Sequence, residues 1–421
     1  MPLETMDTYR KLPLDLQGIV NLFMGEPMFH PGLLDDYISH LELRERAHSY
    51  LVYHGASGRF WPCGPIQYVL LDDQQSLEYN LGIIEHHGGP ACRMYVQCTD
   101  AAHTTSLVRK LQLQDVVIVS LLHGELDYSG FFGTNQYRGY CNEEGFLSHC
   151  DHLEQVVFYM PWVDSIGNEW LRSCKSLKSA RFVGMTSLVN VGRRWMMSCK
   201  SLEYVEFYGV RCLKHVNGYW LTGASSLCSI SFHGLDTLYS VGPLWMSGCT
   251  LLVDVDFGAL NQLHCVGYEW MSRCISLHDV KFRGLHNLCS VGANWLDSCT
   301  KLEHPTFLGL DRVEHIGSQW MYNCSSLVSP SFRGLMNLRY VGHSWMSRCG
   351  RLESPNFIGL DSLSEVGHSW MSHCDDMKYP NFCGLVSLET ISHSWMHNCS
   401  QFTFHSKYLG TSWFFVPSIE K

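Results

Sequence analysis

The chain has 421 residues, of which 46% are hydrophobic and 17% charged, and its formal net charge is −10. This composition excludes a disordered chain, because enough apolar side chains are present to bury a large core. The negative charge argues against nucleic acid as a partner, since phosphate binding needs clustered Lys and Arg. No run of 18 apolar residues occurs, so we expect no membrane-spanning helix and no membrane contact.

The nineteen cysteines would indicate disulfides in a secreted protein. The N-terminal residues MPLETMDTYRKLPLDLQ, however, contain Glu4 and Asp7 and lack an apolar stretch, unlike a signal peptide or a mitochondrial transit peptide. We therefore expect a reducing environment in which most cysteines are free thiols. The predicted location is cytoplasmic, or associated with the cytoskeleton.

Residues 1–60 are predicted to form a helical N-terminal segment. His30 and Pro31 are followed by GLLDDYISHLELRERAHSYLV, which places Pro early and apolar residues at helical spacing. The stretch 15–24, DLQGIVNLFM, predicts a second, shorter helix. The sequence leaves open whether this segment binds a partner or only caps the rest of the chain.

Residues 61–145 are predicted to be irregular cap repeats. Short β-like runs occur at 66–71, 93–98 and 116–122, and terminal coils of a stacked array need a distinct outer surface. The stretch 124–145 is rich in Gly, Asn and Tyr and is predicted to be an inserted loop. This loop is either a plain surface excursion or a binding element.

A repeat of 25 residues dominates the region 146–400, which is predicted to hold about ten units. Its unit is V-G-x-x-W-M-x-x-C-x-S-L-x-x-V-x-F-x-G-L-x-x-L-x-x, and an imperfect copy starts at Phe146. Cysteine follows each Trp by four residues except at Ala224. Tryptophan stands at 170, 195, 220, 245, 270, 295, 320, 345, 370 and 395.

Each unit is predicted to be one coil of a solenoid. The stretch S-L-x-x-V-x-F alternates and predicts a half-buried strand, whereas W-M-x-x-C predicts a short helical or 3₁₀ turn. The fold class is therefore an α/β repeat solenoid, with one parallel β-sheet on one face and helical or 3₁₀ turns on the other. Stacking would place identical residues in ladders of Trp, Phe, Leu and Cys through the core.

The order of residues in the unit resembles the BspA-like, or treponemal-type, leucine-rich repeat. The elements that carry the resemblance are Cys299, Leu302, Pro305, Phe307, Leu310, Val313, Ile316, Gly317, Trp320, Met321 and Cys324. The alanine and phenylalanine typical of that family are replaced here by Trp and Met, and each unit is two residues longer. The resemblance implies a right-handed solenoid and a role in protein binding or adhesion. Many members of that family are surface proteins of bacteria and protists.

Proline replaces the strand valine in four consecutive units, at 305, 330, 355 and 380. Proline lacks a backbone N–H and is poorly tolerated inside a sheet. We therefore expect shorter or displaced strands in these four coils.

The outward positions of the strands are the predicted partner-binding face. They vary from unit to unit while the core positions barely change, and their mixed polarity suits a protein partner. The predicted residues are Arg181, Tyr204, Glu206, Tyr208, His233, Asp254, Asp256, Lys281, Arg283, His304, Arg333, Asn356 and Tyr379.

No cofactor, metal site or catalytic residue is predicted. The Cys ladder lies in register with Trp and Leu, as expected of small buried side chains rather than of metal ligands. His343, His368 and His393 fall on adjacent coils, but no carboxylate repeats beside them, so we interpret them as solvated. Catalytic motifs such as G-x-S-x-G, a phosphate loop or H-E-x-x-H are absent, so we expect no enzyme.

The leading hypothesis is a non-catalytic scaffold, an architectural subunit of a multi-subunit cytoplasmic or cytoskeletal assembly. The alternative is a recognition receptor, either a surface adhesin or a ligase substrate adaptor. Residues 401–421 leave the period and carry several aromatic residues, among them Trp413, Phe414 and Phe415. This tail either caps the last coil or docks into a partner.

Overall fold

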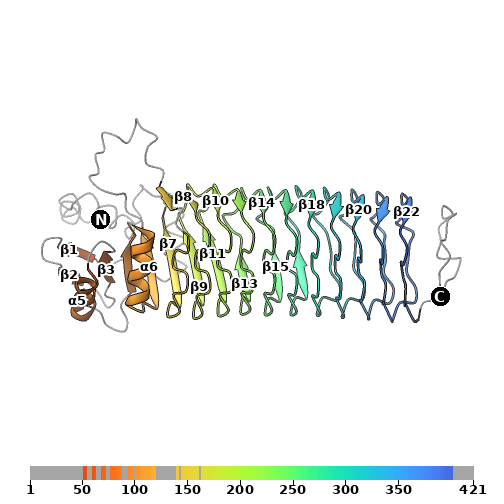
Figure 1. The fold of residues 1–421 in the computed structure, drawn as a ribbon. Coiled ribbons are helices and arrows are strands. Elements are labelled where there is room, and N and C mark those ends of the chain that lie inside the picture. Colours follow the sequence, from red (N-terminus) through yellow and green to blue (C-terminus); the bar gives the residue numbers. More distant parts are fainter. Residues whose placement is uncertain are drawn as a thin grey trace, which may run out of the picture.

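The chain forms a parallel β-solenoid whose coils repeat every 25 residues (Figure 1). The structure is a computed structural model, and it describes residues 51–54, 59–62, 68–72, 76–87, 93–98, 100–119, 139–141, 144–160 and 163–401. The helix predicted at 15–24, nearly all of the helix predicted at 32–52, most of the loop at 124–145 and nearly all of the tail at 401–421 lie outside the described residues. Residues 51–54 and 59–62 form strands, so the helical prediction for residues 1–60 is wrong at its end, and residues 139–141 of the predicted loop also form a strand. No described helix is long and apolar enough to cross a membrane.

The N-terminal part begins with a pair of antiparallel strands and continues into two βαβ units. Strands β1 and β2 pair with each other, and the parallel strands β3, β4 and β5 are joined by helices α5 and α6. The bounds are β1 Leu51–His54, β2 Arg59–Pro62, β3 Tyr68–Asp72, α5 Leu77–His87, β4 Arg93–Gln97, α6 Ala101–Lys110 and β5 Asp115–Val119. The three β-like runs predicted between 66 and 122 are therefore strands, whereas neither α5 nor α6 was predicted.

Helix α6 shows why its sequence pattern was missed. Asp100 caps it, because its carboxylate accepts the main-chain N–H of His103 at 2.7 Å. Its buried face, however, includes Thr104 and Thr105 beside Leu107 and Val108. The hydroxyl of Thr105 donates to the main-chain oxygen of Ala101, and this hydrogen bond offsets the free-energy cost of burying the hydroxyl. The apolar periodicity that reveals a helix is therefore broken by polar residues that the fold can bury.

The first sheet runs along one side of the solenoid. Strand β5 pairs with β7, and the sheet continues through β9 and β11 to β13; a separate pair, β15 with β17, follows in the next coils. The bounds are β7 Gln155–Tyr159, β9 Ser179–Val183, β11 Tyr204–Tyr208, β13 Ser229–Ser231, β15 Asp254–Asp256 and β17 Asp279–Lys281. Successive coils pair residue for residue, as Phe158, Phe182 and Phe207 do. These are the strands that the alternating stretch predicts.

The prediction of shorter strands in the proline coils is confirmed. From Pro305 onward the first sheet is reduced to isolated parallel bridges, which join Thr306, Ser331, Asn356 and Asn381 in succession. Each proline lies one residue before its bridge and has no N–H to give to the next coil. Single bridges therefore replace the three- and five-residue strands of the earlier coils.

A second parallel sheet, which was not predicted, runs along the opposite side, so the prediction of one sheet face is wrong. Its strands lie at the V-G step of each unit, and nearly all have only two residues, too few to show an alternating pattern. The bounds are β6 Gly139–Cys141, β8 Val163–Ile166, β10 Asn190–Val191, β12 His215–Val216, β14 Ser240–Val241, β16 Cys265–Val266, β18 Ser290–Val291, β19 His315–Ile316, β20 Tyr340–Val341, β21 Glu365–Val366 and β22 Thr390–Ile391.

The W-M-x-x-C segment is not helical, so the prediction of helical or 3₁₀ turns is also wrong. In each coil the residues flanking Trp take positive φ, for example Glu269 at 58° and Met271 at 52°. Their N–H groups point in opposite directions along the solenoid. Glu269 donates to Ala293 of the next coil at 2.7 Å, and Met271 donates to Trp245 of the preceding coil at 3.0 Å. Hydrogen bonds between coils thus offset the cost of left-handed backbone.

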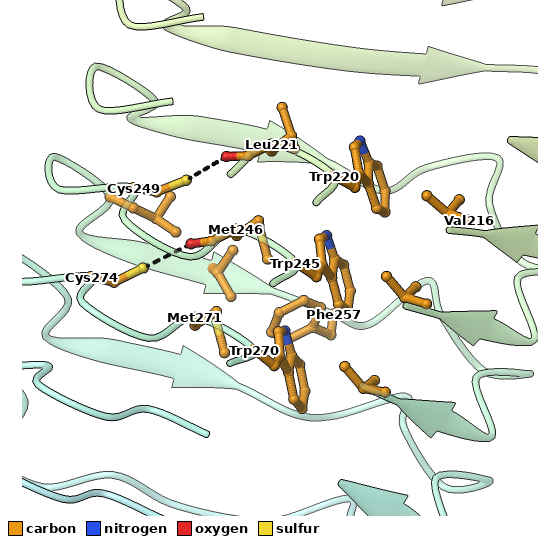
Figure 2. Close-up of a cluster of buried hydrophobic side chains, with 14 of the residues drawn as sticks. Val216, Trp220, Leu221, Trp245, Met246, Cys249, Phe257, Trp270, Met271 and Cys274 are labelled. Carbon is orange, nitrogen blue, oxygen red and sulfur yellow. Dashed lines mark hydrogen bonds between the residues drawn. The ribbon is translucent and has the colours of Figure 1, made fainter. Parts of the chain in front are cut away.

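The core consists of aromatic ladders between the two sheets (Figure 2). Trp245 and Trp270 are fully buried and stack with centroids 5.5 Å apart and planes 3° apart. Phe257 meets Trp270 edge-on at 5.2 Å. This pattern recurs from Trp195 to Trp370, and each stacked or edge-on pair adds to the stability gained by burial. The predicted ladders of Trp, Phe, Leu and Cys are confirmed.

Candidate functional site

The predicted partner-binding residues all lie on the outer side of the first sheet and its continuation, which we call the candidate face. Direct partners in neighbouring coils include Arg181 with Glu206 and Asp256 with Lys281. Arg181 and Tyr208 are half-buried. The other eleven are exposed: Tyr204, Glu206, His233, Asp254, Asp256, Lys281, Arg283, His304, Arg333, Asn356 and Tyr379. The face is therefore one continuous surface, and its role in binding remains a prediction.

The N-terminal part of the candidate face is electrostatically balanced. Arg181 Nε lies 3.0 Å from a carboxylate oxygen of Glu206, on the neighbouring strand. Beside them, the Glu203 carboxylate accepts a hydrogen bond from the phenol of Tyr204, which raises the pKa of Tyr204 above its ordinary value. The Arg181–Glu206 ion pair therefore presents little net charge on this part of the face.

The middle of the face carries unpaired negative charge. Asp254 and Asp279 are direct partners in the parallel register of β15 and β17, and both are exposed. Among the described residues, neither carboxylate has a Lys, Arg or His nitrogen within 4.0 Å. Like charges that face each other across strands destabilise a sheet. Folding alone therefore does not explain why both residues are acidic.

Large apolar side chains are exposed in the same two coils as this acidic pair, and these were not predicted from the sequence. Leu251, Val253 and Ile275 are 54%, 49% and 44% exposed, in the same two coils as Asp254 and Asp279. We call these five residues the acidic–apolar patch. A signal was present in the sequence: Leu251 replaces a serine that other units hold at 201, 226, 276 and 326.

The C-terminal part of the face is held by weaker polar contacts. His304 Nδ1 lies 2.8 Å from the hydroxyl of Ser329, and the Asn381 amide donates to Asn356 at 3.3 Å. Tyr379 is 57% exposed. Leu308 and Ile358 also stand exposed here, beside Arg333 in the intervening coil. This part offers aromatic and apolar contacts with little net charge.

The Cys ladder is a structural feature in the described coils. Each ladder thiol from Cys174 to Cys399 donates to a main-chain oxygen of the preceding coil, as Cys249 does to Leu221 at 3.4 Å (Figure 2). Burial raises the pKa of Cys274 and of Cys349 to about 12. These thiols therefore stay protonated and act as neutral hydrogen-bond donors. Within the described residues, no group of three His, Cys, Asp or Glu side chains is arranged to hold a metal ion.

Comparison with protein families gives one assignment. A model described as a BspA type leucine rich repeat region matches residues 142–262 and 248–378, with six copies of the repeat. No curated protein sequence matches the chain.

Three solved structures similar to this chain are leucine-rich repeat proteins. A leucine rich cell surface protein of Faecalibacterium prausnitzii is 14% identical, covers 70% of this chain and 90% of its own, and has a TM-score of 0.31. A protein of Eubacterium ventriosum is 13% identical, with coverages of 62% and 86% and a TM-score of 0.26. A protein of Bacteroides ovatus is 16% identical, with coverages of 54% and 77% and a TM-score of 0.20.

Proposed function

The chain belongs to the BspA-type leucine-rich repeat family, and from this membership we propose that it is a non-catalytic scaffold that binds protein partners through its candidate face. Two properties of the coils support this proposal. The core rungs repeat the same residue from coil to coil, whereas the outward positions change in charge, size and polarity. A fixed framework with a varied surface is the arrangement that specific protein recognition requires.

The acidic–apolar patch is the observation that carries the proposal. Asp254 and Asp279 place like charges at directly paired positions of β15 and β17, and three large apolar side chains of the same two coils are exposed. A partner that covers Leu251, Val253 and Ile275 gains their burial, about 25 cal/mol per Å² of apolar surface. A basic group on that partner also relieves the repulsion between the carboxylates. Both gains favour a protein partner over a nucleic acid.

A comparison of two variants tests this proposal. In the first variant Asp254→Asn, Asp279→Asn and Val253→Ser alter the patch; in the control Asp361→Asn and Asp236→Asn remove two exposed acids outside the candidate face. Proteins crosslinked to each variant in the native cells are quantified by mass spectrometry. The patch variant is expected to lose its principal partners about 10-fold or more, the effect of about 1.4 kcal/mol in affinity. Equal recovery by the patch variant and the control would rule out this face.

For the setting, we propose an architectural subunit of a multi-subunit cytoplasmic or cytoskeletal assembly. The support is the state of the cysteines: Cys212, Cys228 and Cys383 are exposed free thiols. Unpaired surface thiols are readily oxidised outside the cell and persist in a reducing compartment. The buried thiols of the ladder likewise serve as protonated donors.

A recognition receptor, either a surface adhesin or a ligase substrate adaptor, is the second candidate, and the family membership favours it. Exposed Cys212 and Cys383 provide the test that separates a surface location from an internal one. A maleimide that cannot cross membranes should label them only after cells are permeabilised if the protein is cytoplasmic. Labelling of intact cells would support the adhesin, and co-purification of ligase subunits would support the adaptor.

A further inference from the structure

A row of interacting side chains on four consecutive coils lies at or one residue before the start of strands β12, β14, β16 and β18 of the second sheet. His215 meets the ring of Tyr239 edge-on with centroids 6.0 Å apart. Tyr239 stacks on His264 at 5.1 Å, with an angle of 9° between the rings. His264 Nδ1 lies 3.6 Å from the thiol sulfur of Cys289. None of these residues belongs to the candidate face, and the repeat pattern gave them no role.

The contact between His264 and Cys289 pairs a thiol with a proton acceptor. Both side chains are half-buried, so each remains accessible to small molecules. The stacked ring of Tyr239 fixes the plane of the imidazole, which keeps Nδ1 beside the sulfur. Nδ1 accepts a proton when the neutral ring carries its hydrogen on Nε2. This is the arrangement by which a base activates a nucleophilic thiol.

The other described cysteines provide contrasts within the same chain. The ladder thiols are buried and donate to main-chain oxygens, whereas Cys289 has both the main-chain oxygen of Asn287 at 3.4 Å and the imidazole of His264 at 3.6 Å as acceptors. Cys383 and Cys212 are exposed, and among the described residues neither has an imidazole in contact. Cys265 lies near Cys289. Burial is the main cause that raises the pKa of Cys265, and the nearby Cys289 thiol raises it further. Among the described surface cysteines, Cys289 alone combines access with an adjacent base.

We propose that Cys289 is a covalent modification site at which small disulfides react, with His264 acting as the base. The Cys289 thiol passes its proton to His264 Nδ1, and the resulting thiolate attacks one sulfur of the disulfide. A bond between Sγ and that sulfur forms as the original S–S bond breaks. The departing thiolate takes the proton from the imidazolium and leaves as a thiol. Cys289 is thereby oxidised to a mixed disulfide, and a free thiol reverses the step by the same exchange.

The test uses the full chain with every cysteine outside the ladder, except Cys289, replaced by Ser. The probe is 5,5′-dithiobis(2-nitrobenzoate), a small aromatic disulfide whose released thiolate is followed by absorbance from pH 5.5 to 9. A matched variant retains Cys383 in place of Cys289. Cys289 is expected to react about 10-fold or more faster than Cys383 at pH 6.5, as base assistance of a proton transfer predicts. The two rates should converge at high pH, where assistance by a base no longer limits the reaction.

His264→Gln examines the role of the base directly. This variant should slow Cys289 by about 10-fold or more at pH 6.5 and little at pH 9, whereas His215→Gln in the same row should change little. Urea melts of both variants check whether each keeps the fold. Glutathione disulfide should then add one adduct, located at Cys289 by peptide mass. Equal rates and pH profiles for Cys289 and Cys383 would overturn the proposal, even if His264→Gln fails to fold.

Discussion

The thiol of Cys274 donates a hydrogen bond to the main-chain oxygen of Met246, in the preceding coil, at 3.3 Å. The same bond joins Cys299 to Met271 at 3.2 Å and Cys324 to Leu296 at 3.1 Å, always across 28 residues. It satisfies a carbonyl that the left-handed turn leaves inside the solenoid. The cysteine repeat therefore follows from the turn itself: a small side chain with one donor fits there.

Removal of one rung should cost stability in proportion to one bond and a small cavity. Cys274→Ala is expected to lower the free energy of unfolding by about 1–2 kcal/mol, measured by urea melts. Ala224 naturally lacks this donor, and its unit provides the reverse experiment. Ala224→Cys places a thiol 28 residues after Met196 and should stabilise the protein. A loss of stability in that variant as large as in Cys274→Ala would contradict the hydrogen-bonding role.

The Trp ladder should determine how cooperatively the array unfolds. Trp295 is fully buried and stacks on Trp270 at 5.4 Å and on Trp320 at 5.3 Å. Trp295→Ala is expected to cost about 3–5 kcal/mol and to broaden the urea transition, because each coil contacts only its neighbours. Trp395→Ala, in the last described coil where Trp395 is only half-buried, serves as the comparison and should cost less. A Trp295→Ala melt that matches the unaltered protein would exclude this role.

The stacked coils and their buried rungs were predictable because identical residues every 25 positions require units that stack in register. Trp170 and Phe182 each recur at one fixed place, and a residue that repeats without change must occupy the same environment in every coil. The strands around Val205 and Val255 followed from alternation, and the four prolines located the loss of strand. Each of these inferences depends on side chains that interact within one unit or with its copies.

The turn and the second sheet were not predictable because their hydrogen bonds join residues about 25 positions apart. Met271 takes φ of 52°, a conformation that its own propensity disfavours, and its bond to Trp245 offsets that cost. The apolar spacing of the segment W-M-x-x-C is equally compatible with a helical turn, which is why the wrong turn was predicted. The patch around Leu251 is visible in the sequence only at residues that depart from the repeat pattern, whereas the fold is predicted from residues that keep it.

Close contact between coils should make certain glycines irreplaceable. Gly334 has φ of 103°, and a Cβ added there would lie 2.4 Å from the main-chain oxygen of Phe307. Gly334→Ala is therefore expected to destabilise the protein by about 1–3 kcal/mol in thermal or urea unfolding. Gly350 is the matched control, since an added Cβ has no atom within 4 Å. Equal effects of alanine at the two positions would show that coil spacing does not restrict Gly334.

Three stacked imidazoles should make the last coils sensitive to acid. The rings of His343 and His368 lie 3.7 Å apart with an angle of 7° between them, and His393 stacks on His368 at 4.9 Å. The main-chain N–H of His368 donates to His343 Nδ1 at 3.2 Å, which requires that nitrogen to be unprotonated. Partial burial, and then the neighbouring imidazoles of His343 and His393, lower the pKa of His368. The prediction from sequence that these histidines are merely solvated therefore omitted their contacts with one another.

The direction of the pH effect follows from this lowered pKa. An unfolded histidine titrates near 6.5, whereas His368 in the folded coil takes up its proton only at lower pH. Above about pH 6.5, His368 is neutral in both the folded and the unfolded chain, and its contribution to stability is complete. As the pH falls from 6.5 through the folded pKa, this contribution is lost because the unfolded chain binds more protons. Hydrogen exchange of residues 366–396 should therefore accelerate between pH 7.5 and 5.5, after correction for the intrinsic exchange rate.

His368→Ser isolates the stack, since serine already stands at the equivalent position, Ser318, of an earlier coil. The variant removes the middle ring, so the acid-induced increase in exchange should become smaller while the coil keeps its backbone hydrogen bonds. His233→Ser, an exposed histidine on the candidate face, controls for general effects of losing an imidazole and should retain the full pH response. An unchanged response in His368→Ser would mean that other titrating groups, and not imidazoles crowded at 3.7 Å, set the acid sensitivity of the last coils.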